Sequence, residues 1–347
     1  MIENFDLLRR LCQEPGIPSR EDAVARLVIA EIGPLVDEVR SDALGNVIAV
    51  KRGEGGPRIM IAAHMDEIGF VVRHVEKEGF IRVHPVGGFD PRVLFAQRVD
   101  IHTREGVLPG VLAPEAKPIH LQTPDDKPAP LRIDNYFVDL GLPAETVAAR
   151  VRVGDMVTLS RDTVQMGDTV VSKALDDRLG VFIMIEALRA VGAHTAEIVA
   201  VATVQEEVGL RGAMPAGYGV EPDIAIALDT TLAMDIPGTS ERERITTLGG
   251  GTAIKIMDGS LICDPRIVDS LRAIAERDGI KHQFEILPFG GTDAGAIQGG
   301  REGVVSGVIS TPSRYVHTVN EMCHGDDIQG AITLLARFLE SAQDIAL

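Results

Sequence analysis

Two adjacent glutamates, Glu206 and Glu207, follow an apolar run at residues 198–204. Such a run is typical of a buried strand that delivers polar residues to a pocket at its carboxyl end. Two neighbouring carboxylates repel each other unless a cation separates their tasks. A metal ion does this, because one glutamate can bind it while the other stays free to transfer protons. Taken alone, the pair also fits a solvated strand end with two surface acids.

Other candidate residues have a similar setting. His64 ends one apolar run, Asp229 follows a second and His317 follows a third, whereas Asp176 lies in the turn before a predicted helix. Asp66 stands two residues after His64, a spacing that lets a carboxylate orient an imidazole that binds a metal. Each of these residues taken singly has an ordinary structural interpretation, and Asp176 equally fits a helix N-cap.

Together these residues predict a metal centre. Groups beyond the carboxyl ends of parallel strands converge on one crevice. Two histidines and three or four carboxylates suffice for two divalent ions, because a carboxylate can bridge ions that are about 4 Å apart. Mixed nitrogen and oxygen ligands suit zinc, cobalt or manganese better than calcium or copper, and the histidines disfavour magnesium. The residues therefore favour a two-metal hydrolase, while leaving non-catalytic interpretations open.

The predicted elements that position these residues show two patterns of secondary structure. Strands alternate with helices across residues 1–69 and again across residues 170–347, which predicts an α/β domain with a largely parallel sheet. Short strands punctuated by Gly and Pro fill the stretch between, which indicates a β-rich insertion built as a small barrel. We place the α/β domain at 1–68 and 165–347 and the insertion at 69–164.

Two helix starts are also predicted. Ser19 followed by Asp22 resembles a capping box ahead of the periodic residues 23–32. A long closing helix is expected over residues 326–346, with Asp326 as its cap.

Composition excludes several classes of function. The net charge of −17 argues against binding to nucleic acids or anionic membranes. No apolar run approaches the roughly 20 residues that span a bilayer, and the first residues do not resemble a signal peptide. Tryptophan is absent and aromatic residues make up 4%, which leaves few stacking platforms for bases or sugars. The three cysteines are far apart and odd in number, which favours a reducing, cytoplasmic compartment.

Six motifs resemble, in their order along the chain, the motifs of the tetrahedral (TET) aminopeptidases. These form the di-metal family forty-two of metallopeptidases, which includes deblocking and glutamyl aminopeptidases. The resemblance covers nearly the whole chain. The motifs are AHMDEIGF (residues 63–70), SKALDDRLG (172–180), VQEEVGLRGA (204–213), ALDTT (227–231), GGTDAGAI (290–297) and SRYVHT (313–318).

The resemblance implies a role for each candidate residue. Asp176 would bridge two divalent ions, most suitably zinc, with cobalt or manganese as alternatives. Glu206 would be the general base, and Asp66 would hold His64 in orientation. The remaining metal ligands would be His64 and Asp229 at one ion, and Glu207 and His317 at the other.

The resemblance also implies an architecture and a substrate class. The fold would be a zinc-peptidase-like α/β catalytic domain with an inserted PDZ-like β-barrel domain that mediates dimerisation. Six dimers would form a hollow tetrahedral dodecamer, and the substrates would be short and medium peptides cut at their N-termini. One departure is LGGGTAI at residues 248–254, where the family more often carries a lysine within LGKGP.

Several alternatives remain open at this point. The same metal ligands would serve a di-metal amidase, deacylase or carboxypeptidase on a related fold. A glycosidase would also use paired carboxylates, although aromatic platforms are scarce here. A metal-stabilised assembly protein without catalysis would need the ligands but not a free base such as Glu206.

Overall fold

The structure is a computed structural model of the 347-residue chain, and it describes residues 2–123, 125 and 130–345. Contacts within the chain divide it into two compact units. The α/β unit comprises Met1–Glu67, Asp162–Val316 and Asn320–Leu347, and the barrel unit comprises Ile68–Arg161 and His317–Val319. The predicted boundaries at 1–68, 69–164 and 165–347 remain predictions, as do the catalytic and dimerisation roles of these parts.

The described residues of the α/β unit form one eleven-stranded mixed sheet. Its strands are β1 (Glu38–Ser41), β2 (Val47–Lys51), β3 (Arg58–His64), β10 (Val164–Met166), β11 (Thr169–Ser172), β12 (Glu197–Thr203), β13 (Ile224–Leu232), β14 (Thr252–Met257), β15 (His282–Ile286), β16 (Val305–Arg314) and β17 (Glu321–His324). The order is β1-β2-β12-β3-β13-β16-β17-β11-β10, while β14 branches from β16 and pairs with β15. The four central strands, β12, β3, β13 and β16, are parallel, as predicted, and mainly antiparallel strands extend the sheet on both sides.

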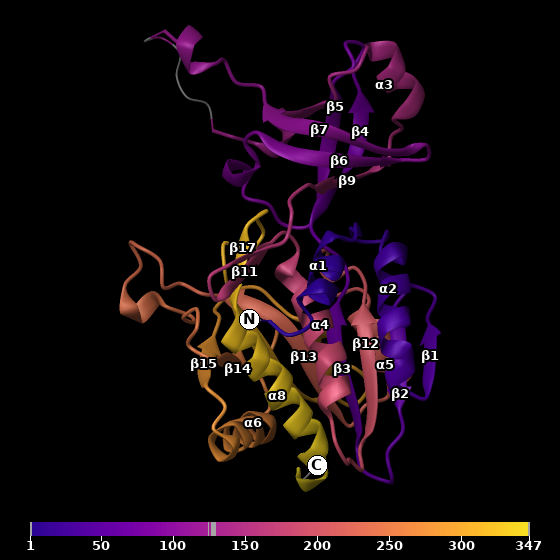
Figure 1. Ribbon diagram of the computed structural model, residues 1–347, viewed down its shortest axis with the longest axis vertical. Coiled ribbons are helices and arrows are strands. Elements are labelled where there is room, and N and C mark those ends of the chain that lie inside the picture. Colours follow the sequence, from indigo (N-terminus) through magenta and orange to yellow (C-terminus); the bar gives the residue numbers. More distant parts are fainter. Residues whose placement is uncertain (1, 124, 126–129, 346–347) are drawn as a thin grey trace. The chain divides into compact units, whose positions relative to one another are not determined.

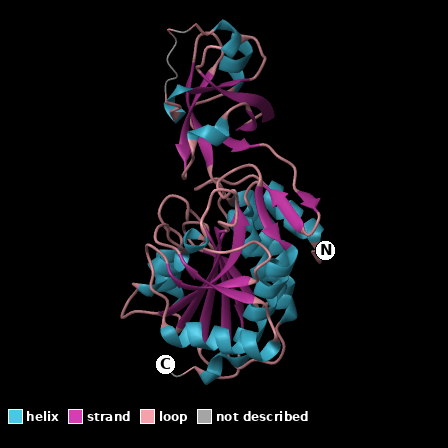
Figure 2. Ribbon diagram, turned by 90° about the vertical axis from the view of Figure 1, so that its left-hand side faces the viewer, coloured by secondary structure: helices cyan, strands magenta, loops and turns pink. Residues whose placement is uncertain are grey.

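Helices cover both faces of this sheet (Figure 2). They are α1 (Phe5–Gln13), α2 (Asp22–Ile32), α4 (Leu175–Ala190), α5 (Ala213–Val220), α6 (Pro265–Asp278), α7 (Asp293–Gln298) and α8 (Gly325–Ser341), with short 3-10 turns at Gly33–Leu35, Glu241–Glu243 and Ala342–Asp344. In Figure 1, α4 and α8 lie side by side against the sheet, and both helices contact it.

Alternating side chains explain why both faces are covered. On β3, Ile59 and Ile61 pack into a core with α1, α4 and α8, whereas Met60 and Ala62 pack into a second core with α5 and α7. Successive side chains of a strand point to opposite faces, so a strand buried on both faces must be apolar throughout. This is the physical reason that the central strands are recognisable as continuous apolar runs.

Two predicted helix caps are wrong. Ser19 does not cap α2, because it has φ +71° and the helix begins after Glu21 without a side-chain cap. Asp326 does not cap α8 either; the His324 side chain accepts a hydrogen bond from the Asp326 amide. The direction from which a loop enters a helix decides which side chain caps it, and tertiary contacts set that direction.

The barrel unit is a closed six-stranded barrel within the described residues, in the order β4-β5-β8-β7-β6-β9. Its elements are β4 (Gly69–Val75), β5 (Ile81–Val86), β6 (Gln97–Thr103), β7 (Gly106–Pro114), β8 (Tyr136–Asp139), α3 (Ala144–Arg150) and β9 (Met156–Leu159), with 3-10 turns at Pro91–Leu94, Ile119–Leu121 and Ile133–Asn135. Its core is separate and includes Phe70, Val99 and Tyr136. Closure leaves no strand edge unpaired around the ring, which suits a small all-β module.

Among the described helices, none combines the length and apolarity that crossing a membrane requires. Cys12, Cys263 and Cys323 are buried and form no disulfide.

Candidate active site

Three neighbouring parallel strands bring candidate residues to their carboxyl ends, on one side of the sheet. His64 is the last residue of β3, and it pairs with Thr203, the last residue of β12. Glu206 follows Thr203 by three residues. In the register of β13 with β3, Ala227 faces Ala62, so two residues further on Asp229 is level with His64. The parallel register therefore brings these side chains to the same end of the sheet.

Helix α4 brings Asp176 to the carboxyl ends of these strands. Asp176 and Asp177 have non-helical backbone angles at the helix start, and the Asp176 amide donates to Glu321 Oε2 at 3.0 Å. The Asp177 carboxylate accepts from the Gly180 amide at 3.0 Å and from the His64 amide at 3.3 Å. Asp177 thus fastens the first turn of α4 to the end of β3, which holds Asp176 beside His64.

The two ring nitrogens of His64 have different partners. Nδ1 lies 3.0 Å from the Asp66 backbone oxygen, which can only accept, so this nitrogen carries the proton. Nε2 lies 3.2 Å from Asp176 Oδ1 and 3.8 Å from Glu206 Oε2. The His64 side chain is 3% exposed, which keeps the ring orientation determined by these contacts. Because Nδ1 keeps its proton, Nε2 is the nitrogen able to ligate a metal, and it is the one that lies beside the carboxylates.

His64, Asp176 and Asp229 form a group with the composition of a metal site. Each offers one ligand atom, and these atoms all lie within 4.8 Å of one another. Ligand atoms around a tetrahedral zinc ion are about 3.3 Å apart when the metal–ligand bonds are about 2.0–2.1 Å. The 3.2 Å separation of His64 Nε2 and Asp176 Oδ1 fits this spacing.

The charges of the site also fit a cation. Burial raises the pKa of Asp229 well above its usual range, and the Asp176 carboxylate raises it further. Burial likewise raises the pKa of Glu206, and repulsion from Asp229 adds to the effect while His64 opposes it. Burial alone lowers the pKa of His64, but the surrounding carboxylates outweigh it and the net pKa is well above its usual range. A divalent ion among these groups would relieve their mutual repulsion.

Asp66 contacts the site in two ways. Its backbone oxygen accepts from His64, whereas its carboxylate accepts from two successive amides: Oδ1 from Glu206 at 3.0 Å and Oδ2 from Glu207 at 3.1 Å. One carboxylate oxygen is also 3.6 Å from His64 Nδ1. The H-x-D spacing therefore does bring Asp66 to the ring, but the closest acceptor is its backbone, and its carboxylate fixes the glutamate pair.

A second possible group shares Asp176 with the first. Carboxylate oxygens of Asp176 and Glu207 lie within 4.8 Å of each other. The third ligand predicted for this group is His317, which is half-buried and belongs by its contacts to the barrel unit. Its place at a second ion remains a prediction.

Sequence reasoning missed two charged residues that interact with the candidate ligands. Asp293, the first residue of α7, accepts a hydrogen bond from the Thr203 hydroxyl, and burial raises its pKa to about 6. Its other oxygen, Oδ1, has no hydrogen-bond partner in the described part of the chain. The signal was present, because Asp293 lies in the GGTDAGAI motif. The sequence does not indicate, however, that this residue lies beside the end of β12.

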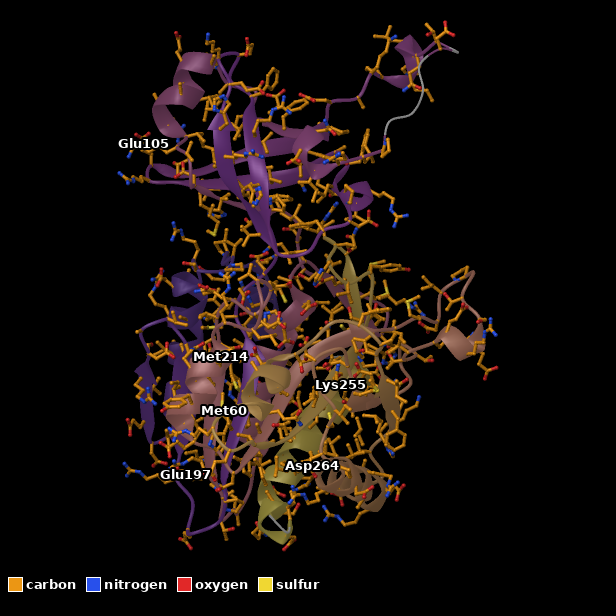
Figure 3. All side chains as sticks on the ribbon, turned by 180° about the vertical axis from the view of Figure 1, so that it is seen from behind. Met60, Glu105, Glu197, Met214, Lys255 and Asp264 are labelled. Carbon is orange, nitrogen blue, oxygen red and sulfur yellow. The ribbon has the colours of Figure 1, made fainter. Side chains whose placement is uncertain are left out.

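The second missed residue is Lys255 on β14, labelled in Figure 3. Its side chain is 1% exposed, and its Nζ lies 2.7 Å from Glu285 Oε1 and 3.3 Å from Asp258 Oδ2. Its positive charge lowers the pKa of Asp229, against the larger effect of burial. Lysine in the middle of an apolar strand gives no sign in the sequence of which acids it meets.

The glycine-rich segment at residues 248–254, where the sequence departs from the family pattern, is held by side chains remote in sequence. The Asp327 carboxylate accepts from the amides of Gly249 and Gly251, each at 2.7 Å. Gln283 donates to the backbone oxygens of Thr247 and Gly251 and occupies the space beside Gly250, so that a Cβ there would overlap it. A longer side chain at Gly250 would require Gln283 to move.

Comparisons with known proteins agree with this architecture. The profile of the M42 glutamyl aminopeptidase family matches residues 45–334. Lysyl aminopeptidase of Pyrococcus furiosus is 34% identical over 343 residues, covering 97% of each chain. The structure is similar to an aminopeptidase of the archaeon Desulfurococcus kamchatkensis, with a TM-score of 0.92 and 40% identity over 97% of this chain and 94% of that one.

A further similar structure is the TET1 peptidase of Pyrococcus horikoshii, which can assemble into a tetrahedron or a large octahedral shell. The TM-score is 0.86 and the identity 32%, covering 96% of this chain and 98% of that one. These likenesses confirm the predicted fold class, an α/β domain with an inserted β-barrel. The chain therefore belongs to the M42 glutamyl aminopeptidase family and is a hydrolase of the aminopeptidase type.

Proposed function

We propose that the protein is a metal-dependent aminopeptidase that removes N-terminal residues from short and medium peptides, with Glu206 as general base. The observation that carries this proposal is the group of His64, Asp176 and Asp229, whose ligand atoms lie within 4.8 Å, with Glu206 Oε2 3.8 Å from His64 Nε2. The three residues would supply metal ligands, and Glu206 would supply a nearby carboxylate that is not needed as a ligand and can transfer protons.

The proposed site holds two divalent ions. His64 and Asp229 would hold one ion, Glu207 and His317 the other, and Asp176 would bridge both. Zinc suits these nitrogen and oxygen donors, with cobalt and manganese next. When bound, such ions lower the pKa of a water molecule toward neutrality and polarise the scissile carbonyl.

The protein's own residues then move and hold the protons. Glu206 would accept the proton of the attacking water and later donate it to the leaving amine, because its side chain is largely buried and faces the ligand group. Asp66 would keep Glu206 in place through the backbone amide that it binds. The Nδ1 proton of His64, held by the Asp66 backbone, would keep Nε2 available as a ligand.

The excess of carboxylates favours a cationic substrate group, and the free amine of a peptide is one. We expect single N-terminal residues to be released from unblocked peptides, and N-acetylation of the same peptides to abolish release. Amidation of the C-terminus should leave the rate unchanged. The three matched peptides are compared by mass spectrometry of the products.

The outcomes separate the alternatives on related folds. Loss of activity on C-terminal amidation would indicate a carboxypeptidase, and release of acetate from the blocked peptide would indicate a deacylase. Either result would overturn the aminopeptidase proposal.

We also propose that the protein assembles into a dodecamer built from six dimers, with the barrel unit mediating the dimer contact. The similarity to TET1 peptidase, which can form a tetrahedron, supports this proposal. Light scattering after size-exclusion chromatography should give a mass about twelve times the chain mass of 37.2 kDa. A monomeric or dimeric mass at micromolar concentration would contradict it.

A further inference from the structure

The segment that carries the two glutamates is held by side chains from distant parts of the chain. Each of four successive backbone amides, from residues 204 to 207, donates to the side chain of a residue remote in sequence. Asn46 Oδ1 accepts from Val204 at 3.0 Å, and Glu21 Oε1 accepts from Gln205 at 3.1 Å. Asp66 accepts from the next two amides, as described above.

The backbone at this point needs such support. Gln205 has φ +58°, in the left-handed region that residues other than glycine adopt at a cost of about 1 kcal/mol or more. This residue turns the chain from the end of β12 toward Glu206. Conformations of this kind persist only where the surrounding contacts over-determine them.

Asn46 secures the two ends of the segment. Its Nδ2 donates to the Gly212 backbone oxygen at 3.0 Å and to Asp42 Oδ2 at 2.6 Å, while its Oδ1 binds the Val204 amide. A Cβ at Gly212 would overlap Asn46 Oδ1 and the Val204 backbone. Residues 204–212 therefore form a closed loop whose base is fixed by Asn46.

Glu21 secures the residue next to Glu206. It is 5% exposed and stands at the start of α2, yet it does not cap that helix. Its Oε1 instead accepts from the amides of Ser19 and Gln205, at 2.9 and 3.1 Å. Burial beside Asp66 raises the pKa of Glu21 to about 7, and both the charged and the neutral carboxyl keep an acceptor oxygen. The contact therefore does not depend on the charge of Glu21.

We propose that Glu21 is a positioning residue for catalysis, which holds the left-handed turn at Gln205 and thereby aims the Glu206 carboxylate at the metal group. The proposal rests on the proposed function, in which Glu206 is the base. Glu21 touches neither substrate nor metal and acts through the backbone of residue 205. Its acceptor oxygen, and not its charge, is the feature required.

The test compares Glu21→Leu, which removes the acceptor, with Glu21→Gln, which retains it. We expect Glu21→Leu to lower kcat about 30-fold, since misplacement of a reacting group by about 1 Å can reduce rates by about 100-fold. KM should change less than about threefold, because no substrate contact is removed. Glu21→Gln should restore most of kcat. Asp22→Leu, an exposed acid in the first turn of the same helix, is the matched control and should match wild type.

A second readout does not depend on activity. Amide hydrogen exchange of the peptide that covers residues 204–212 should be faster in Glu21→Leu than in Glu21→Gln, at equal metal content. If the leucine variant does not fold, Glu21→Ala replaces it. Alanine leaves space that water can enter, and the water can accept hydrogen bonds from the freed amides. The alanine variant should lose about tenfold in kcat.

Three outcomes would overturn the proposal: full kcat in a folded, metal-loaded leucine or alanine variant, equal losses in the glutamine and leucine variants, or unchanged exchange at residues 204–212. Failure of the proposed function is distinguishable, because wild-type protein itself would then release no N-terminal residues while the exchange difference persisted.

Discussion

Glu206→Gln is expected to lower kcat by about 10²–10⁴-fold, the range that general acid–base catalysis supplies. Glutamine has the same shape as glutamate but cannot accept the proton of the attacking water. The backbone amide of residue 206 remains bound to Asp66, so the substitution leaves the loop in place. Steady-state kinetics on an unblocked peptide, with metal analysis and thermal unfolding of the same samples, measures the effect.

Glu207→Gln is the matched control, because it changes the neighbouring residue in the same chemical way. Because Glu207 is a proposed ligand, the Glu207→Gln variant should lose metal, whereas the Glu206→Gln variant should retain two ions per chain. Residual kcat above about a tenth of wild type in Glu206→Gln would remove Glu206 from the role of base. Equal loss of metal in both variants would indicate that Glu206 is a ligand instead.

Removal of metal by a chelator is expected to abolish peptide hydrolysis, and zinc, cobalt or manganese should restore it. The physical reason is the concentration of buried carboxylates around His64, which a divalent ion neutralises. The fold should persist without metal, because extensive apolar cores and the hydrogen bonds of Asp66 and Asp177 hold the site residues. Metal at about 1,000 times its Kd would stabilise the folded state by about 4 kcal/mol, visible as a rise in Tm.

Magnesium and calcium serve as controls for this experiment. Both prefer oxygen ligands, so neither should restore activity at concentrations where zinc does. Unfolding of the chain on metal removal would favour the metal-stabilised assembly protein over the enzyme, since a structural site contributes to folding outright. Full hydrolysis by protein shown to contain no metal would contradict the proposed mechanism.

The largest features of the fold are predictable because they depend on local patterns. Strands buried on both faces must be apolar throughout, which makes β3, β12 and β13 recognisable as continuous apolar runs in the sequence. Polar residues that interrupt such strands at their ends are conspicuous for the same reason. The sequence therefore predicts His64, Glu206 and Asp229 as site residues, and the parallel register brings them to the same end of the sheet.

Features that depend on the approach of distant segments were not predictable. The capping pattern at Ser19 is a local signal, yet the loop before α2 turns so that Glu21 binds Gln205, 184 positions away. Asp293 was overlooked because nothing nearby in the sequence indicates that α7 begins beside Thr203.

Asp66 illustrates the division most directly. By itself, the amino-acid sequence determined the types of the site residues, their positions at strand ends and the small spacing of Asp66 from His64. Only the tertiary structure decided that the Asp66 backbone holds the imidazole while its carboxylate binds two amides 140 and 141 positions further along. The physical reason is that apolar periodicity is written into each segment, whereas a buried polar group bonds to whatever partner folding brings near it.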